Sequence, residues 1–408
     1  MRVSEPTYVK ECDVQYNVIS ADNHILEPPN TFIDRVPAKY KDQSPRIVRG
    51  KDGGDGWSLD GSIPESTIGL PHGLGSVNPG ARIRIAPRGL IWDEVRPGNY
   101  DGASHIKDMQ SDGIDAAVVY PQMVYRAYTG LQNRDLALEC LRAFNDWLLD
   151  DFCSADPQRL IGMCMIPWEH PMDVLTAELE RVLKKGARAI FLPYTMNPPI
   201  YAPYWDPMWK LISDASAVAS VHLRFGGTRA PDPPLPDGLK KSWIFSVNIV
   251  MGYFSAIQPL TELIYTGLFE RFPALKFVHA EVDMGWVPFW GAIMDQIVRQ
   301  HNYWVDWPMT ANPSTYIGKN VFVTGLDDVE GFRLAREGND LIARGAMFSI
   351  DYPHEITLWG TTQKVLAELT EGLDPQVKHS ILAGTAVKLY NLGDSAAAHV
   401  AEREAITV

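Results

Sequence analysis

The chain has 408 residues, of which 46% are hydrophobic and 21% are charged, and this is enough apolar material to bury a large core. The formal net charge is −13, which leaves no basic surface of the kind that neutralises phosphates and argues against nucleic acid as a partner. An anionic substrate would need a local positive patch or a metal ion.

The N-terminus and the cysteines indicate a soluble cytoplasmic protein. The first residues, MRVSEPTYVKECD, hold acids and no apolar signal-peptide core, and the chain nowhere has about 18 consecutive apolar residues. Cys12, Cys140, Cys153 and Cys164 form no CxxC pair, which indicates reduced thiols. We therefore expect no membrane partner and no disulfides.

Short β-branched segments alternate with amphipathic ones along the chain, which is typical of βα units around a parallel sheet. The eight predicted strands, in chain order, are residues 16–21, 114–120, 160–166, 187–192, 218–223, 276–280, 321–324 and 347–350. The predicted helices include residues 133–153, 171–185, 205–215, 287–301 and 357–369. Eight strands favour a closed (β/α)₈ barrel, and no GxGxxG turn follows the first strand to support an open dinucleotide-binding sheet.

Residues 25–111 interrupt this alternation. They are rich in Gly, Pro and Asp and are too long for an ordinary loop between a strand and a helix. We expect one α/β domain over residues 1–408, with residues 25–111 inserted as a cap after the first strand. A second irregular stretch, residues 228–241, follows the fifth strand, and loops at this end of a barrel usually shape the pocket.

Metal-ligating residue types gather at the predicted strand ends. His24, His222 and His279 are three of the ten histidines, and Asp22 and Asp351 end the first and eighth strands. Each could be a turn or core residue by itself, but the carboxyl ends of barrel strands share one mouth, where active sites lie. Imidazole and carboxylate ligands suit Zn²⁺, Mn²⁺ or Fe²⁺, and the sequence therefore predicts a metal site.

Four motifs resemble the amidohydrolase-2 group of the amidohydrolase superfamily, which includes aminocarboxymuconate-semialdehyde decarboxylase and aromatic-acid decarboxylases. The motifs are SADNHILEP, VHLRFGG, FVHAEVDMGW and SIDYPH. The resemblance implies a distorted TIM barrel in which Asp22, His24, His222 and Asp351 bind the metal, with His279 as a catalytic neighbour. Asp22 replaces the first histidine of the common His-x-His pair, as in some decarboxylases, and GARAIFLPY lacks the lysine of carbamate-bridged dinuclear hydrolases.

Three further residues bear on the chemistry. Glu281 and His354 follow His279 and Asp351 closely, and each could orient a ligand or line the pocket. They could instead join His279 as ligands of a second metal, because some relatives of this fold are dinuclear iron oxygenases. Arg224, two residues after His222, could pair with a substrate carboxylate or form a salt bridge at the rim.

The predicted function is a metal-dependent lyase or hydrolase that decarboxylates or hydrolyses a small organic acid, with His279 and Asp351 as the catalytic residues and Arg224 and His354 on the substrate. Zn or Mn is the expected ion. The alternative is a non-haem iron oxygenase with two irons. A non-enzymatic barrel is disfavoured because the ligand set is complete. We also expect a homo-oligomer, most often a dimer for barrel enzymes of this kind.

Overall fold

We describe the protein from a computed structural model, which covers residues 15–64, 68, 89–193, 196–223, 238 and 241–393, with the backbone alone for 241–245. Arg224, Cys12 and all but residues 238 and 241 of the stretch 228–241 lie outside these described residues. Cys140, Cys153 and Cys164 are buried and free. Among the described helices, none has both the length and the apolar composition that crossing a bilayer requires.

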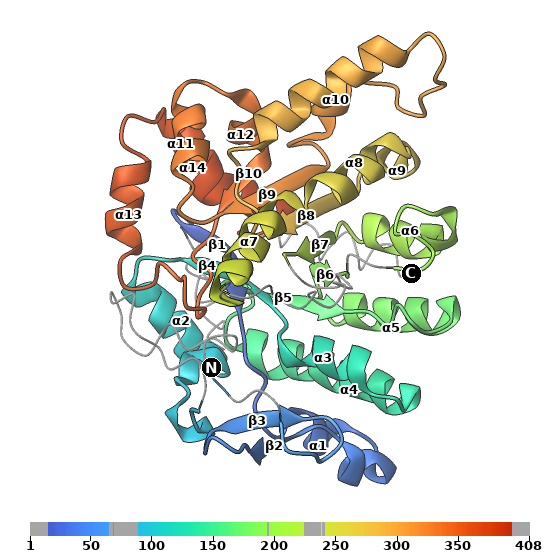
Figure 1. The fold of residues 1–408 in the computed structure, drawn as a ribbon, viewed down its shortest axis with the longest axis vertical. Coiled ribbons are helices and arrows are strands. Elements are labelled where there is room, and N and C mark those ends of the chain that lie inside the picture. The colour runs from blue at the N-terminus through green and yellow to red at the C-terminus, as the bar shows by residue number, and fades with distance from the viewer. Residues whose placement is uncertain are drawn as a thin grey trace, which may run out of the picture.

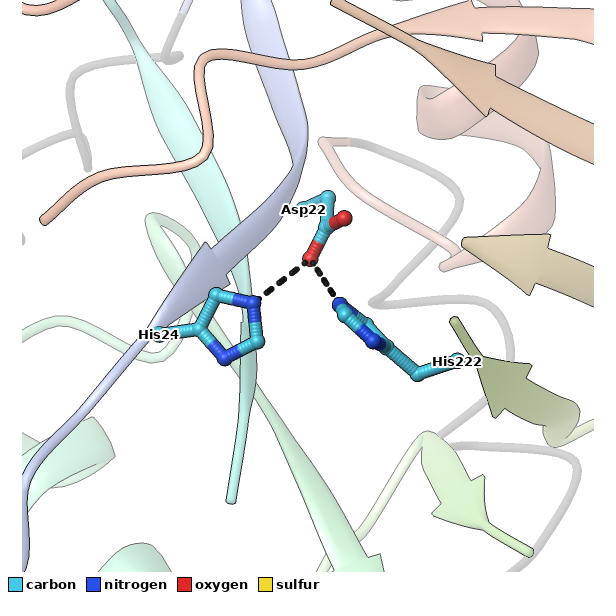
Figure 2. A group of neighbouring side chains, drawn as sticks. All are labelled: Asp22, His24 and His222. Carbon is cyan, nitrogen blue, oxygen red and sulfur yellow. Dashed lines mark hydrogen bonds and ion pairs between the residues drawn. The ribbon is translucent and has the colours of Figure 1, made fainter. Parts of the chain in front are cut away.

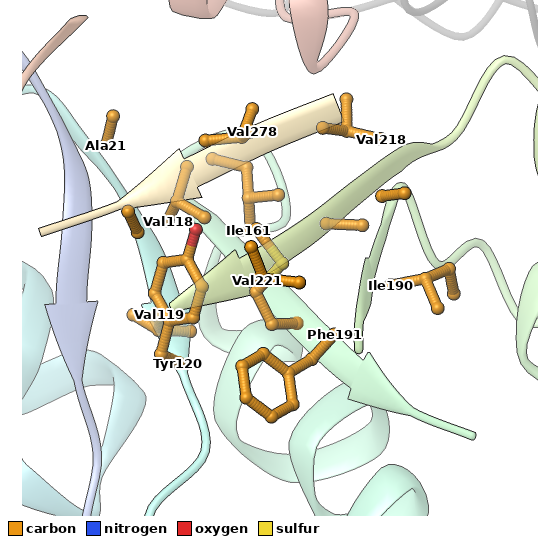
Figure 3. Close-up of a cluster of buried hydrophobic side chains, with 14 of the residues drawn as sticks. Ala21, Val118, Val119, Tyr120, Ile161, Ile190, Phe191, Val218, Val221 and Val278 are labelled. Atoms are coloured by element: carbon orange, nitrogen blue, oxygen red, sulfur yellow. The ribbon is translucent and has the colours of Figure 1, made fainter. Parts of the chain in front are cut away.

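Eight parallel strands form one sheet in the order of the chain, and helices surround it (Figure 1). The strands are β1 (Ile19–His24), β4 (Ala116–Tyr120), β5 (Leu160–Met165), β6 (Ala189–Phe191), β7 (Val218–His222), β8 (Lys276–Ala280), β9 (Val321–Gly325) and β10 (Ala346–Phe348). Almost every residue of these strands is buried, which is why most of them, though not β1, read as short apolar runs. Figure 3 shows a cluster of their buried apolar side chains. The predicted α/β TIM barrel is confirmed.

The residues that follow β10 bring the last strand against the first. The backbone N–H of Asp351 donates to the carbonyl of Asp22 at 3.0 Å, and the N–H of His24 donates to the carbonyl of Tyr352 at 2.6 Å. The sheet is thereby nearly closed into a barrel, and the closure sets Asp351 beside Asp22 and His24.

Of the five predicted helices, those at 171–185, 205–215 and 287–301 are confirmed and two need correction. The helices of the barrel are α3 (Met123–Gly130), α4 (Arg134–Asp146), α5 (Met172–Lys184), α6 (Asp206–Asp214), α7 (Lys241–Phe254), α8 (Ile257–Tyr265), α9 (Leu268–Arg271), α10 (Val287–His301), α11 (Val329–Arg336), α12 (Asp340–Gly345), α13 (Thr362–Leu369), α14 (Pro375–His379) and α15 (Thr385–Leu389). The predicted helix 133–153 changes to a π-helical turn over Trp147–Phe152. The predicted helix 357–369 begins only at Thr362. The backbone N–H of Leu358 donates to the carbonyl of Ile350, and Gly360 has a φ of +84°, which a right-handed helix does not allow.

The first predicted strand also needs correction. Prediction ended it at residue 21, where polar residues begin, whereas β1 runs to His24 and its last residues pair with Val119 and Tyr120 of β4. An irregularity in register between Ser20 and Asn23 precedes this pairing. Asp22 and His24 therefore lie within the strand and not just past it.

The residues between β1 and β4 form small elements beside the barrel. They comprise α1 (Thr31–Arg35), the antiparallel pair β2 (Arg46–Arg49) and β3 (Asp55–Ser58), and α2 (Gly102–Ser111). Figure 1 shows β2, β3 and α1 at the lower edge of the molecule and α2 nearer the barrel.

Candidate metal centre

Two ligand-type side chains come from β1. Asp22 and His24 are both buried and occupy alternate positions of the strand, so they lie on the same side of it. The Nε2 atom of His24 lies 3.5 Å from Oδ1 of Asp22 (Figure 2). This pair forms one side of the centre.

His222, the last residue of β7, completes the group that Figure 2 shows. Its Nε2 lies 3.2 Å from Oδ1 of Asp22, and its Nδ1 donates to the carbonyl of Leu223 at 2.9 Å. Because the Nδ1 bond fixes the ring, Nε2 is held toward Asp22 and His24. Burial opposes a charge on this ring, but the Asp22 carboxylate raises the pKa of His222 to about 9.

Asp351, in the segment that follows β10, lies beside Asp22 and His24 where the barrel closes. It has a φ of +51°, a conformation that non-glycine residues adopt at an energetic cost and that is often found at functional sites. Its Oδ1 lies 3.3 Å from Nε2 of His24 and 2.9 Å from Nδ1 of His354. The His354 ring also stacks on the His24 ring, with 3.8 Å between the centroids. His354 is thereby a direct neighbour of the cluster.

Burial and neighbouring charges shift the pKa values of His24, Asp22 and Asp351, and the shifts differ in direction. Burial lowers the pKa of His24 well below its usual value, which keeps its ring neutral. Burial also raises the pKa of Asp22. Although burial opposes it, the neighbouring His354 and His24 hold the pKa of Asp351 well below its usual range. The centre thus combines a neutral imidazole with an ionised carboxylate, both of which are forms that bind metals.

The hydrogen bonding of this cluster fits a bound cation. Among the described residues, Oδ2 of Asp22, both ring nitrogens of His24 and both carboxylate oxygens of Asp351 are buried without a hydrogen-bond partner. Two of these atoms, Oδ1 of Asp351 and Nε2 of His24, lie within ion-pair distance of a neighbour, which leaves three without such a contact. A buried polar atom left unpaired costs about 1–3 kcal/mol, so three such atoms in one place need an explanation. Coordination to an ion would satisfy them.

The distances agree with coordination. Two ligands that each lie about 2.1 Å from one ion are roughly 3.0–3.4 Å apart. Within the described residues, Asp22, His24 and His222 form one group whose ligand atoms are mutually within 4.8 Å, and His24, Asp351 and His354 form another. Because His24 belongs to both groups, the two are parts of one cluster.

His279 and Glu281 are placed differently from this cluster. His279 is buried in β8, burial lowers its pKa to about 3, and its Nδ1 donates to the carbonyl of Ala280 at 3.1 Å. Neither ligand group within the described residues includes it. Glu281, with a φ of +58°, has its Oε2 atom 3.7 Å from Nδ1 of His222, on the far side of that ring from Asp22. Burial and the charge of Asp351 raise the pKa of Glu281 to about 8.

Tyr253 on α7 is a candidate site residue that the sequence did not indicate. Burial and then the charges of Asp283, Glu281 and Asp351 raise the pKa of its hydroxyl, so the phenol lies within the electrostatic reach of the centre and is protonated. Its hydroxyl makes no hydrogen bond to the residues that the structure describes. The preceding Gly252 packs against Leu223, since a Cβ there would lie 3.0 Å from its side chain. No motif marks this tyrosine, because it lies on α7, well past the VHLRFGG motif in sequence.

The chain is similar to known proteins in both sequence and fold. The family model described as Amidohydrolase (Amidohydro_2) matches residues 76–392, which include His222, His279, Glu281, Asp351 and His354 and leave out Asp22 and His24. No curated protein sequence matches the chain.

Solved structures show the same fold at low sequence identity. An amidohydrolase of Mycobacterium avium subsp. paratuberculosis is 17% identical, covers 92% of this chain and 99% of its own, and has a TM-score of 0.66. A 5-carboxyvanillate decarboxylase of Sphingomonas paucimobilis is also 17% identical, with 93% and 100% covered and a TM-score of 0.61. The 5-carboxyvanillate decarboxylase of Novosphingobium aromaticivorans, in complex with manganese and 4-hydroxy-3-methoxy-5-nitrobenzoic acid, is 18% identical, with 92% and 96% covered and a TM-score of 0.60.

Proposed function

The chain belongs to the amidohydrolase family, and from this premise we propose that it is a divalent-metal-dependent decarboxylase of a small aromatic or enolic acid. We propose Asp22, His24, His222 and Asp351 as the metal ligands and Mn²⁺ as the first ion to test. The observation that carries the proposal is the buried cluster of ligand atoms without hydrogen-bond partners. Manganese and an aromatic acid in the complex of the Novosphingobium decarboxylase support the choice of ion and substrate class.

Decarboxylation sets two requirements for the site. The bond between the carboxyl group and the ring or enol carbon breaks, carbon dioxide leaves, and the electron pair that remains on the carbon takes up a proton. A bound divalent ion would hold substrate oxygens and stabilise the negative charge that develops. The protein must therefore orient the acid and bring a proton to the carbon.

Asp351 and His354 are the residues that we propose for handling the proton. Asp351 is buried, and His354 lies 2.9 Å from its Oδ1. A carboxylate with an adjacent histidine can accept and return a proton without a large movement. His279 is proposed as a neutral catalytic neighbour on the adjacent strand β8. In a hydrolase with the same ligands, Asp351 or His279 would instead take a proton from an attacking water.

Tyr253 is proposed to bind the substrate. Burial and the charges of Asp283, Glu281 and Asp351 raise its pKa, so the hydroxyl keeps its proton and can donate a hydrogen bond to a substrate oxygen. Arg224 is retained as a second proposed substrate residue, from its place two residues after His222.

Metal content and product release test the proposal together. The chain is purified without added metal, its ions are counted by elemental analysis, and the Mn²⁺-loaded form is incubated with hydroxybenzoates and their carboxylated derivatives while carbon dioxide is measured. We expect one ion per chain and carbon dioxide from at least one acid. Ester or amide cleavage with no carbon dioxide would favour the hydrolase.

The dinuclear iron oxygenase remains the second candidate because His354 and Glu281 lie beside the proposed ligands, at 2.9 Å from Asp351 and 3.7 Å from His222. It requires two irons per chain and oxygen consumption. One ion per chain with no oxygen consumption would contradict it.

A further inference from the structure

One face of helix α2 contacts the two chain segments that carry the proposed ligands. His105 and Asp108 are three residues apart in the helix and so lie on the same side of it. Both are buried. His105 contacts the β1 segment, and Asp108 contacts the segment after β10. The mechanism proposed above uses neither residue.

The contact with β1 is a chain of hydrogen bonds through Asn23, which lies between Asp22 and His24. The Nδ1 of His105 donates to the carbonyl of Gly98 at 2.8 Å, which leaves Nε2 to accept from the Asn23 amide at 3.0 Å. The Asn23 carbonyl oxygen accepts from the Ser20 hydroxyl at 2.6 Å, and that hydroxyl oxygen accepts from the N–H of Ile350 at 2.9 Å. Each donor in this chain faces an acceptor, so the amide group of Asn23 has one preferred orientation.

The contact with the other segment goes through Tyr352, the residue after Asp351. The Tyr352 hydroxyl donates to Oδ2 of Asp108 at 2.6 Å, and the Arg96 Nε donates to the same oxygen at 2.6 Å. The indole N–H of Trp359 donates to the backbone carbonyl of Asp108 at 2.8 Å, and Arg96 lies 4.7 Å over the Trp359 ring. Hydrogen bonds to an ionised carboxylate are stronger and more directional than neutral ones.

The junction is tightly packed as well as hydrogen-bonded. The His105 and Tyr352 rings meet edge to face, with centroids 4.9 Å apart. A Cβ on Gly98 would lie 2.2 Å from both the Tyr352 hydroxyl and the Asp108 carboxylate, so only glycine fits there. Tyr352 is fully buried and has little room to move.

We propose that α2 is a clamp that positions the metal centre, with His105 fixing the Asp22–His24 segment through Asn23 and Asp108 fixing Asp351 through Tyr352. His105, Asp108 and Tyr352 are positioning residues, since none of them belongs to the ligand groups within the described part of the chain. The inference rests on the proposed metal-dependent function. It gives the region between β1 and β4 a role in metal binding in addition to the predicted role of a cap.

Binding of Mn²⁺ alone tests the clamp, with Tyr352→Phe as the variant and Tyr316→Phe as its matched control. Both changes remove the hydroxyl of a buried tyrosine that donates to a carboxylate, Asp108 in one case and Glu270 in the other. We expect Tyr352→Phe to raise the Mn²⁺ dissociation constant about 10- to 100-fold, as loss of a group that orients a ligand commonly does. Tyr316→Phe should leave it within about twofold while lowering the melting temperature similarly.

A second variant and a second readout keep the test independent of stability. His105→Phe keeps an aromatic ring and breaks the contact with Asn23, so it should weaken Mn²⁺ binding in the same way even if Tyr352→Phe is recovered only as insoluble protein. The visible absorption of the Co²⁺-loaded protein should change in both variants and stay unchanged in Tyr316→Phe, because that absorption depends on ligand geometry.

The outcomes separate the clamp from the function on which it rests. Wild-type affinity for Mn²⁺ in Tyr352→Phe or His105→Phe, or equal losses in Tyr352→Phe and Tyr316→Phe, would overturn the clamp alone. A wild-type chain that binds none of Mn²⁺, Zn²⁺ and Fe²⁺ would overturn both the clamp and the proposed metal-dependent function.

Discussion

The ends of β7 and β8 carry the same side chain in two different electrostatic settings. His222 and His279 are both buried, and in each ring Nδ1 donates to the carbonyl of the next residue. The pKa of His222 is raised to about 9 and that of His279 is lowered to about 3. Burial acts against the charged form in both, so the difference comes chiefly from Asp22, which lies 3.2 Å from His222, with a smaller contribution from Glu281.

This comparison teaches that a histidine at a strand end is not thereby a ligand. The position of β1 in the closed barrel decides which strand end faces the Asp22 carboxylate, and that strand is β7. We therefore propose His222 as a metal ligand and His279 as a residue beside the substrate. The predictions below test that division of roles.

The largest expected effect is the loss of metal in His222→Ala. Removal of a proposed ligand should weaken Mn²⁺ binding by more than about 100-fold, beyond the range for residues that only orient ligands. His279→Ala should retain one ion per chain and lose activity. Isothermal titration with Mn²⁺ and elemental analysis of both variants measure this, and equal metal loss in the two would end the distinction between the strands.

Glu281→Gln should have the next largest effect, because Oε2 of Glu281 lies 3.7 Å from Nδ1 of His222. Above about pH 8, where the Glu281 carboxyl is ionised, a neutral amide there should weaken Mn²⁺ binding about tenfold, at the lower end of the range for neighbours of ligands, with one ion still bound. Glu178→Gln is the control, since Glu178 is a buried carboxylate that is paired with Arg181 on α5, away from the centre. A fall from two irons to one in Glu281→Gln would show instead that Glu281 is a ligand in a dinuclear centre.

Tyr253→Phe should weaken substrate binding about tenfold, the value of one net hydrogen bond, and leave Mn²⁺ binding unchanged. The probe is 4-hydroxy-3-methoxy-5-nitrobenzoic acid, titrated into the Mn²⁺-loaded chain. Tyr303→Phe removes a hydroxyl from a ring that is 82% exposed and should bind the probe as the wild type does. Equal binding by Tyr253→Phe and the wild type would remove Tyr253 from the substrate site.

Local sequence patterns were sufficient for the barrel elements. The strand at 276–280 and the helix at 287–301 occur where predicted, as Lys276–Ala280 and Val287–His301, because apolar periodicity and buried β-branched runs depend on neighbours in sequence. The end of β1 was missed because Asp22, Asn23 and His24 are poor strand formers, and their pairing with β4 outweighs that preference.

Contacts between distant segments could not be predicted. The Tyr352 bond to Asp108 joins residues 244 positions apart, and although Tyr352 lies in the SIDYPH motif, no motif marks Asp108. The predicted strand ends indicated that Asp22, His24, His222 and Asp351 converge. They did not indicate that Asp22 lies beside His222 and not beside His279, because that depends on how the strands are arranged in the barrel. The cap, the homo-oligomer and the roles of the site residues stay predictions.

The smallest expected effect is on how stability varies with pH in the metal-free chain. A free histidine has a pKa of about 6.5, so folded His222 retains its proton up to about pH 9, whereas the unfolded chain releases it earlier. Its contribution to stability is present below pH 6.5 and is lost as the pH rises to 9. Folded His279 binds no proton above about pH 3, so its contribution is lost as the pH falls below 6.5.

Urea unfolding of the metal-free chain between pH 4 and 9 measures both slopes. The raised pKa of His354, about 9, adds to the alkaline slope, and the lowered pKa values of His24 and His105 add to the acid slope. Each variant below therefore removes only the share of one proton, which is below about 1.4 kcal/mol per pH unit. Asp22→Asn should flatten the alkaline slope, because it removes the charge that holds the proton on His222, and should leave the acid slope unchanged. His279→Gln should do the reverse. If Asp22→Asn left the alkaline slope unchanged, the charge of His222 would not come from Asp22, and the contrast between the two strand ends would need another cause.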